Sequence, residues 1–126
     1  MSKEKSDNEL IEETIDNYFK GMYHGDVERL KKAFHPEAHV IGHFDRNFIF
    51  NSLDQFLDFV KSSPVPAEKG EEYDMRIVLT DITGDVGCVK VEDLYQGRRF
   101  TDYLTVLKHE NNWVIINKGY RHEPKS

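Results

Sequence analysis

The stretch that decides the fold is "YFKGMYHGDVERLKKAFHPEAHVIG", residues 18–42. Gly25 and Asp26 form a turn near its middle, because glycine ends one helix and aspartate can cap the next. The second helix stops at the His35–Pro36 pair, since a residue before proline avoids the helical region. β-branched and aromatic residues follow, which is typical of a strand. The stretch therefore predicts a helix, a turn, a short helix and a strand, in that order.

The residues before this turn predict a long first helix. Ser6 and Glu9 have the spacing of a capping box, in which each side chain bonds to the other's backbone. Apolar side chains then recur at helical spacing. They are Leu10, Ile11, Ile15, Tyr18, Phe19 and Met22. Tyr18 therefore faces inward, where its hydroxyl needs a hydrogen-bond partner.

The residues after the quoted stretch predict a hairpin, a third helix and four more strands. Ser52, with Gln55 three residues later, forms a second capping box and opens the helix. The strands are joined by short polar turns, which indicates an antiparallel meander. Alternation along the first of them places four side chains on one face: Tyr73, Met75, Ile77 and Leu79. Helices followed by such a sheet predict an α+β fold.

Composition and charge limit the partners. The 126 residues carry a net charge of −6, which disfavours nucleic acid and anionic membrane surfaces alike. No signal-peptide core or membrane-length apolar run is apparent, and the single Cys88 cannot form an internal disulfide. We expect a cytoplasmic protein of one domain, residues 1–126, with about residues 1–6 and 123–126 frayed.

Three histidines with a spacing of four raise the possibility of a metal site. A helix would align His35, His39 and His43, but Pro36 and the strand-like residues after it argue against a helix. In a strand His39 and His43 share one face, whereas His35 belongs to the turn. A zinc site needs three or four converging ligands. We therefore expect no metal and no cofactor, and histidines at a helix end, on the surface or at an interface.

The quoted stretch, together with "FTDYLTVLKHENNWVIINKGY" at residues 100–120, resembles the nuclear transport factor 2-like (NTF2-like) superfamily. The resemblance runs from about residue 9 to residue 120 and is strongest to its lumazine-binding branch, also called SnoaL-like. It implies a cystatin-like fold, in which a cone-shaped, curved, mixed or antiparallel sheet packs against three helices from the N-terminal half. The superfamily includes isomerases, dehydratases, cyclases, binding modules and inert partners, so the fold alone does not define a reaction.

Asp102 is a candidate for a functional carboxyl group. It shares its strand face with Phe100 and Leu104, and burial among apolar neighbours would raise its pKa so that it could donate a hydrogen bond to a ligand carbonyl. The alternative is a structural role, in which Asp102 caps a turn or pairs with a nearby arginine. The candidate arginines are Arg76, Arg98 and Arg99.

The chain also resembles the ketosteroid isomerases of the same superfamily. In those enzymes a tyrosine and a protonated aspartate donate hydrogen bonds to a developing enolate oxygen. The resemblance places Tyr18 in the first role and Asp102, approximately, in the second. The family's proton-moving aspartate falls on Gly42, which has no side chain, so the resemblance argues against an isomerase. His43 could replace that base if a bulge turned it inward.

The leading interpretation is a protein that binds a small, mostly apolar or aromatic molecule inside the cone, oriented by Tyr18 and Asp102. The expected pocket walls, which could equally be plain core, are Phe44, Phe56, Phe59, Leu104 and Tyr120. An alternative is isomerase-, cyclase- or dehydratase-like acid–base catalysis in the same pocket. A third is a protein-interaction module. Tyr103 and Leu107 make the second sheet face apolar, which indicates a homodimer through that face.

Overall fold

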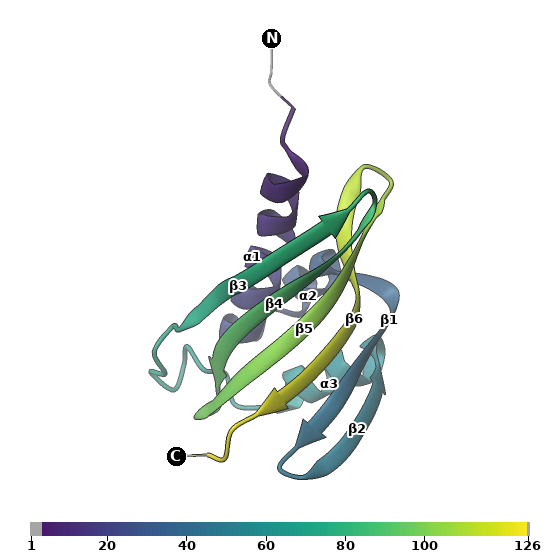
Figure 1. Cartoon of the computed structure of the whole chain (residues 1–126). Helices are drawn as coiled ribbons and strands as arrows, with labels where there is room; N and C mark the ends of the chain where they lie inside the picture. Colours follow the sequence, from purple (N-terminus) through teal and green to yellow (C-terminus); the bar gives the residue numbers. More distant parts are fainter. Residues whose placement is uncertain (1–3, 126) are drawn as a thin grey trace.

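The computed structural model describes residues 4–125. Figure 1 shows the elements in chain order. The helices are α1 (Asp7–His24), α2 (Val27–Ala33) and α3 (Leu53–Ser62). The strands are β1 (Phe34–Phe44), β2 (Asn47–Ser52), β3 (Met75–Thr83), β4 (Val86–Tyr95), β5 (Arg98–His109) and β6 (Asn112–His122).

The predicted helix starts are confirmed. The predicted end of the second helix is wrong, because α2 ends at Ala33 and β1 already includes His35 and Pro36. Ser6 and Glu9 form the capping box of α1, and Ser52 and Gln55 form that of α3. Asp26 caps α2 by accepting from the Arg29 backbone N–H. The expected fraying of residues 1–6 and 123–126 falls partly on residues 1–3 and 126, which lie outside the described residues.

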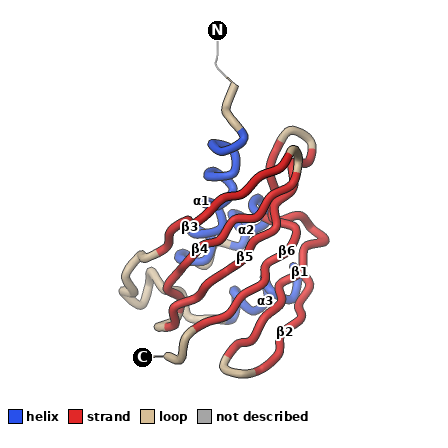
Figure 2. Tube along the Cα trace, viewed as in Figure 1, coloured by secondary structure: helices blue, strands red, loops and turns tan. Residues whose placement is uncertain are grey.

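The strands form one mixed sheet in the order β2-β1-β6-β5-β4-β3. Neighbours are antiparallel except β1 and β6, which run parallel. The sheet is curved, and the three helices lie against its concave side (Figures 1 and 2). The Thr14 hydroxyl donates to the Trp113 carbonyl at 2.6 Å and so joins α1 to β6. The predicted α+β cone is therefore confirmed.

Alternation decides which side chains reach the core between sheet and helices. In β5, Phe100, Asp102 and Leu104 are buried, whereas Tyr103 on the opposite face is exposed. Asp102 therefore lies on the face covered by the helices, which the sequence alone left open. No helix of the described chain is both long and apolar enough to cross a membrane.

Two bulges interrupt the alternation. In β3 the pairing shifts between Ile77 and Leu79, so Leu79 turns outward and is 57% exposed. The prediction that Leu79 shares a face with Ile77 is therefore wrong, because the extra residue reverses the side-chain direction. In β6 the pairing with β5 shifts, because Val106 pairs with Ile115 but Thr105 pairs with Asn117. Ile116 is therefore an extra residue without a partner in β5. Beyond it, Lys118 faces inward.

Candidate functional site

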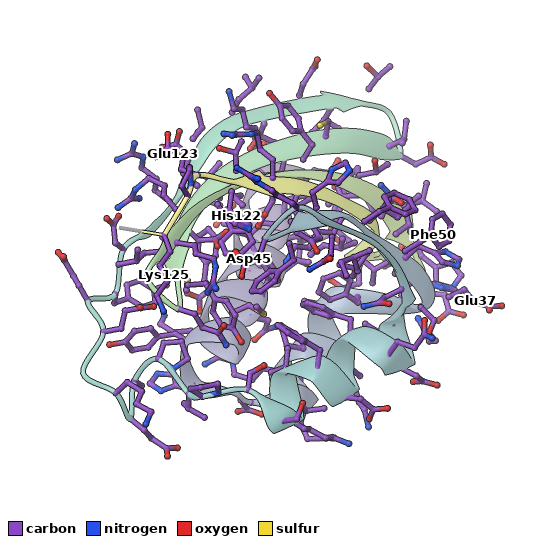
Figure 3. The ribbon with its side chains drawn as sticks, turned by 90° about the horizontal axis from the view of Figure 1, so that it is seen from below. Glu37, Asp45, Phe50, His122, Glu123 and Lys125 are labelled. Atoms are coloured by element: carbon purple, nitrogen blue, oxygen red, sulfur yellow. The ribbon has the colours of Figure 1, made fainter. Side chains whose placement is uncertain are left out.

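A cavity of about 80 Å³ lies under the sheet, at the end of the cone near the β1–β2 turn. Figure 3 looks at this end of the molecule, where Asp45 and His122 lie side by side. Six aromatic side chains line the cavity: Phe44, Phe56, Phe59, Tyr95, Phe100 and Tyr120. The polar side chains of Asn51, Asp93 and Lys118 also reach it. The site is therefore an aromatic pocket with a few converging polar groups.

Four predicted wall residues line this cavity, namely Phe44, Phe56, Phe59 and Tyr120. Leu104 does not, because its side chain is fully buried in the core. Whether any of them contacts a ligand stays a prediction.

Tyr18 and Asp102 meet in the core, from α1 and β5. The Tyr18 hydroxyl donates to Asp102 Oδ2 at 2.6 Å, and both side chains are buried. Burial and the negative charge of Asp102 raise the pKa of Tyr18, so the phenol remains protonated and keeps donating. Because its donor is engaged with Asp102, Tyr18 offers no free hydroxyl to a ligand, and neither residue is among those lining the cavity.

The arginines considered as partners of Asp102 are engaged elsewhere. Arg76 pairs with Glu92 of β4. Arg98 pairs with Asp45, and Arg99 pairs with Asp74. Asp102 is therefore held by Tyr18 rather than by an arginine.

Asp93 on β4 is a site residue that the sequence reasoning missed. Its side chain is 5% exposed, lines the cavity and lies within hydrogen-bonding reach of Asp102. Burial, and then the neighbouring Asp102 carboxylate, raise the pKa of Asp93 well above the ordinary aspartate value. Both effects favour the protonated, neutral form of Asp93. Alternation along β4 could have revealed it, because Val89 and Val91 share its buried face.

One proton shared between the two carboxyl groups explains their unpaired atoms. Within residues 4–125, Asp93 Oδ2 and Asp102 Oδ1 are buried without a hydrogen-bond partner. Two adjacent buried carboxylates repel each other, and a proton on one of them supplies the missing donor. The Tyr18 hydroxyl fixes the far side of Asp102. Tyr18, Asp102 and Asp93 therefore lie in a row, and Asp93 is the member that lines the cavity.

Lys118 on β6 is the second residue that the sequence reasoning missed. Its side chain is 4% exposed and lines the cavity. Its Nζ lies 5.0 Å from the Tyr18 ring centre, 4.8 Å from that of Phe56 and 5.2 Å from that of Tyr120. In the described part of the chain, Lys118 takes part in none of the ion pairs. Three rings therefore lie close to this amine, and within residues 4–125 no carboxylate lies within ion-pair distance of it, although Asp93 lines the same cavity.

The half-buried Phe44 lines the cavity where it opens to the surface, here called the mouth, and an ion pair lies beside this residue. The Arg98 guanidinium lies 4.6 Å from the Phe44 ring centre and binds Asp45 through two hydrogen bonds of 2.9 and 2.7 Å. His122 Nε2 accepts from the Asp45 backbone N–H at 2.9 Å. These contacts hold the β1–β2 turn against the end of the sheet, so they fix the position of Phe44.

The histidines do not converge. His39 and His43 lie on the outer face of β1, beside Phe50 and Phe48 of β2. His35 accepts a hydrogen bond from the Glu37 backbone N–H instead. Among residues 4–125 no cluster of three His, Cys, Asp or Glu side chains could hold a metal ion. The inward turn that a base role for His43 required is absent, so His43 does not face the cavity.

Comparison with known proteins places this geometry in a family. Residues 6–121 match the family described as "Putative lumazine-binding". The chain belongs to that family. Its relative "Aldolase FrzH" from Cladobotryum sp is 26% identical over 110 residues, which cover 86% of this chain and 85% of the relative.

Solved structures confirm the NTF2-like superfamily. An NTF2-like protein of unknown function from Silicibacter pomeroyi DSS-3 is 28% identical, has a TM-score of 0.78, and is matched over 94% of this chain and 100% of that one. Another from Methylobacillus flagellatus KT is 26% identical, has a TM-score of 0.80, and is matched over 98% and 99% of the two chains. Family and fold together support a small-molecule-binding domain.

Gly42 marks where this NTF2-like chain departs from the isomerase pattern. A Cβ atom on Gly42 would lie 2.7 Å from Tyr120 Cδ1 on the adjacent strand, which is closer than atoms pack. Glycine is therefore required for β1 and β6 to approach. A carboxylate side chain at position 42 would displace Tyr120. The ionisable side chains that line the cavity are instead those of Asp93 and Lys118, together with the phenols of Tyr95 and Tyr120.

Proposed function

We propose that the chain binds a small, flat, mostly apolar molecule that presents a carbonyl-type oxygen to Lys118 and Asp93. One observation carries this proposal. The cavity is lined mainly by aromatic side chains, and the few polar side chains that reach it chiefly offer hydrogen-bond donors. The family match supports a ligand of this general kind, because lumazine is a flat heterocycle with carbonyl groups.

The charges and protons at the site favour an acceptor on the ligand. Lys118 has only donors to offer. Burial raises the pKa of Tyr120 to about 12, so this phenol is protonated near neutral pH and can donate. Asp93, as a neutral acid, carries a third donor. A carboxylate-poor, donor-rich pocket binds a carbonyl or enolate oxygen better than a cation.

The size of the cavity limits what enters. Its volume of about 80 Å³ is well below the roughly 300–1,000 Å³ of typical ligand pockets. We propose that a single ring enters fully and that a bicyclic ligand extends past Phe44 or displaces it. Phe44 is only half-buried, and its ring packs against Phe59 and the Arg98 guanidinium at the mouth.

Thermal unfolding with matched ligands tests the proposal. Acetophenone and lumazine should raise the melting temperature in a concentration-dependent way, whereas ethylbenzene, which lacks the carbonyl, should raise it less. Ile49→Trp fills the cavity and should abolish the shift, because Ile49 lines it. Phe50→Trp is the matched control, since Phe50 is the next residue on the same strand but 58% exposed. Equal responses of the two variants would refute a ligand in this cavity.

A second candidate is an enzyme that moves protons next to a carbonyl group. The relative named "Aldolase FrzH" supports it, and isomerase-, cyclase- and dehydratase-like reactions need the same chemistry. Here Asp93 and Lys118 would transfer the protons, with Tyr18 and Asp102 behind them, and His43 would have no part. Hydrogen exchange at the methyl group of acetophenone in D₂O, followed by NMR, should be accelerated by the wild type and lost in Asp93→Asn. An unaccelerated wild type would argue against catalysis while leaving binding intact.

Assembly and location belong to the same proposal. Tyr103, Val78 and Val86 are exposed on the outer sheet face, and a second copy of the chain would cover them. Tyr103→Glu should then give a monomer in light scattering, while Thr83→Glu at the sheet edge should not. A dimeric Tyr103→Glu variant would exclude this face. We propose a cytoplasmic location, supported by the single, exposed thiol of Cys88.

A further inference from the structure

We propose that Lys118 forms an imine with an aldehyde or ketone in the cavity, with the Asp93–Asp102 pair as the proton donor and acceptor. This inference rests on the proposed binding of a carbonyl compound and adds a covalent step to it. Three features carry it: the burial of Lys118, its lack of a carboxylate partner, and the acid beside it.

Lys118 differs from every other described lysine. It is the one lysine buried within residues 4–125, and its side chain lines the cavity. Lys20 and Lys108, for comparison, are partly or fully exposed and pair with Asp16 and Asp7. An amine held by a carboxylate must first break that ion pair before it can attack. Lys118 has none to break, because ring faces surround it.

The carboxyl pair supplies the proton movements that imine formation needs. The Lys118 ammonium gives one proton to the pair, and the neutral amine attacks the carbonyl carbon to form a C–N bond. The carbonyl oxygen takes up protons through Asp93 and leaves as water while the C=N bond forms. Overall, an ammonium and a carbonyl compound give an iminium and water, so atoms, charge and electrons balance without a further reactant.

The surroundings suit the product as well as the reactant. Lys118 carries one positive charge before the reaction and the iminium carries one afterwards. The rings of Tyr18, Phe56 and Tyr120 that face the ammonium can therefore face the iminium. The carboxyl pair carries one negative charge in both states, and the positive charge at Lys118 balances it each time. The released water can leave through the mouth beside Phe44.

Reductive trapping tests the inference on the full chain. Benzaldehyde fits the single-ring limit of the cavity, and sodium cyanoborohydride converts its imine into a stable benzyl-lysine. Intact-mass and peptide mass spectrometry should find the benzyl group on Lys118 at aldehyde concentrations that leave the exposed lysines unlabelled. Lys118→Arg keeps the positive charge but cannot form an imine, so this adduct should be lost. Lys90→Arg should retain it, since Lys90 lies over Tyr103 on the outer face.

The outcomes separate this inference from the proposed function. A thermal shift with acetophenone but no benzyl group on Lys118 overturns the imine and leaves carbonyl binding standing. The absence of both shift and adduct overturns both. Labelling of Lys118 no faster than of exposed lysines also overturns the imine. Lys118→Met, which keeps the aliphatic stem, provides a second folded variant if Lys118→Arg is destabilised, and it too should lack the adduct.

Discussion

Replacing Tyr18 by phenylalanine isolates the hydrogen bond that connects α1 to the buried carboxyl pair. The ring would stay in place against Phe34, while Asp102 would lose the donor that now lies 2.6 Å from its Oδ2. A hydrogen bond to a charged group contributes about 1.5–3 kcal/mol, and a buried acceptor left unsatisfied costs a similar amount. We therefore expect Tyr18→Phe to lower the free energy of unfolding by about 2 kcal/mol.

The assay is urea unfolding followed by the fluorescence of Trp113, which is fully buried and the one tryptophan in the sequence. A loss of about 2 kcal/mol corresponds to a fall of roughly 6–10 °C in melting temperature for a domain of this size. Tyr23→Phe is the matched control. Its hydroxyl donates to the uncharged backbone carbonyl of Glu71 in a partly exposed position. The free energy of unfolding should therefore fall by about 1 kcal/mol or less.

A double-mutant cycle refines the same prediction. If the Tyr18 hydroxyl acts through Asp102, then Tyr18→Phe should lower stability much less in an Asp102→Asn background than in the wild type. Additive effects, or a loss below about 0.5 kcal/mol for Tyr18→Phe alone, would refute a charged Asp102 held by this phenol. The proton would then reside on Asp102 rather than on Asp93.

Three further predictions concern single positions. The raised pKa of Asp93 means that the folded state holds this proton more tightly than the unfolded state. Its contribution to stability is therefore full below the ordinary aspartate pKa and is lost as pH rises toward the folded pKa. Urea unfolding at pH 5 and pH 8 should show that Asp93→Asn removes part of this decline, and an unchanged pH dependence would contradict the assignment. Gly42→Ala should lower stability by about 1–3 kcal/mol in the same assay, because its methyl group would overlap Tyr120; a neutral effect would mean that β1 can shift freely. Ser52→Ala should lower stability by about 1 kcal/mol by removing the cap of α3, whereas Ser52→Thr should not.

Local patterns in the sequence predict much of the fold and part of the site. The capping boxes at Ser6 and Ser52 place the starts of α1 and α3, because each depends on two residues three apart. Helical spacing turns Tyr18 inward, and strand alternation does the same for Asp102. These two side chains come from opposite ends of the chain, and their meeting depends on the cone that the family resemblance implied.

Asp93 follows from the same alternation along β4, because Val89 and Val91 lie on the same buried face. Lys118 does not follow from any local pattern. Strict alternation from Trp113 and Ile115 would place Asn117 inside and Lys118 outside. The bulge at Ile116 reverses this, and its position is set by pairing with β5 rather than by residues nearby in sequence. The bulge in β3 likewise depends on pairing with a neighbouring strand, which explains why the predicted face of Leu79 is wrong.

The parallel pairing of β1 with β6 has a consequence for how the chain is made. β1 leaves the ribosome early, with β2 on one side, but the partner for its other side is β6, which is synthesised after the other strands of this sheet. Until then the inner edge of the β1–β2 hairpin carries unpaired backbone groups that can join another nascent chain. A premature stop before residue 112 would therefore leave a fragment prone to aggregate, and the intact chain should complete this sheet only after β6 is released.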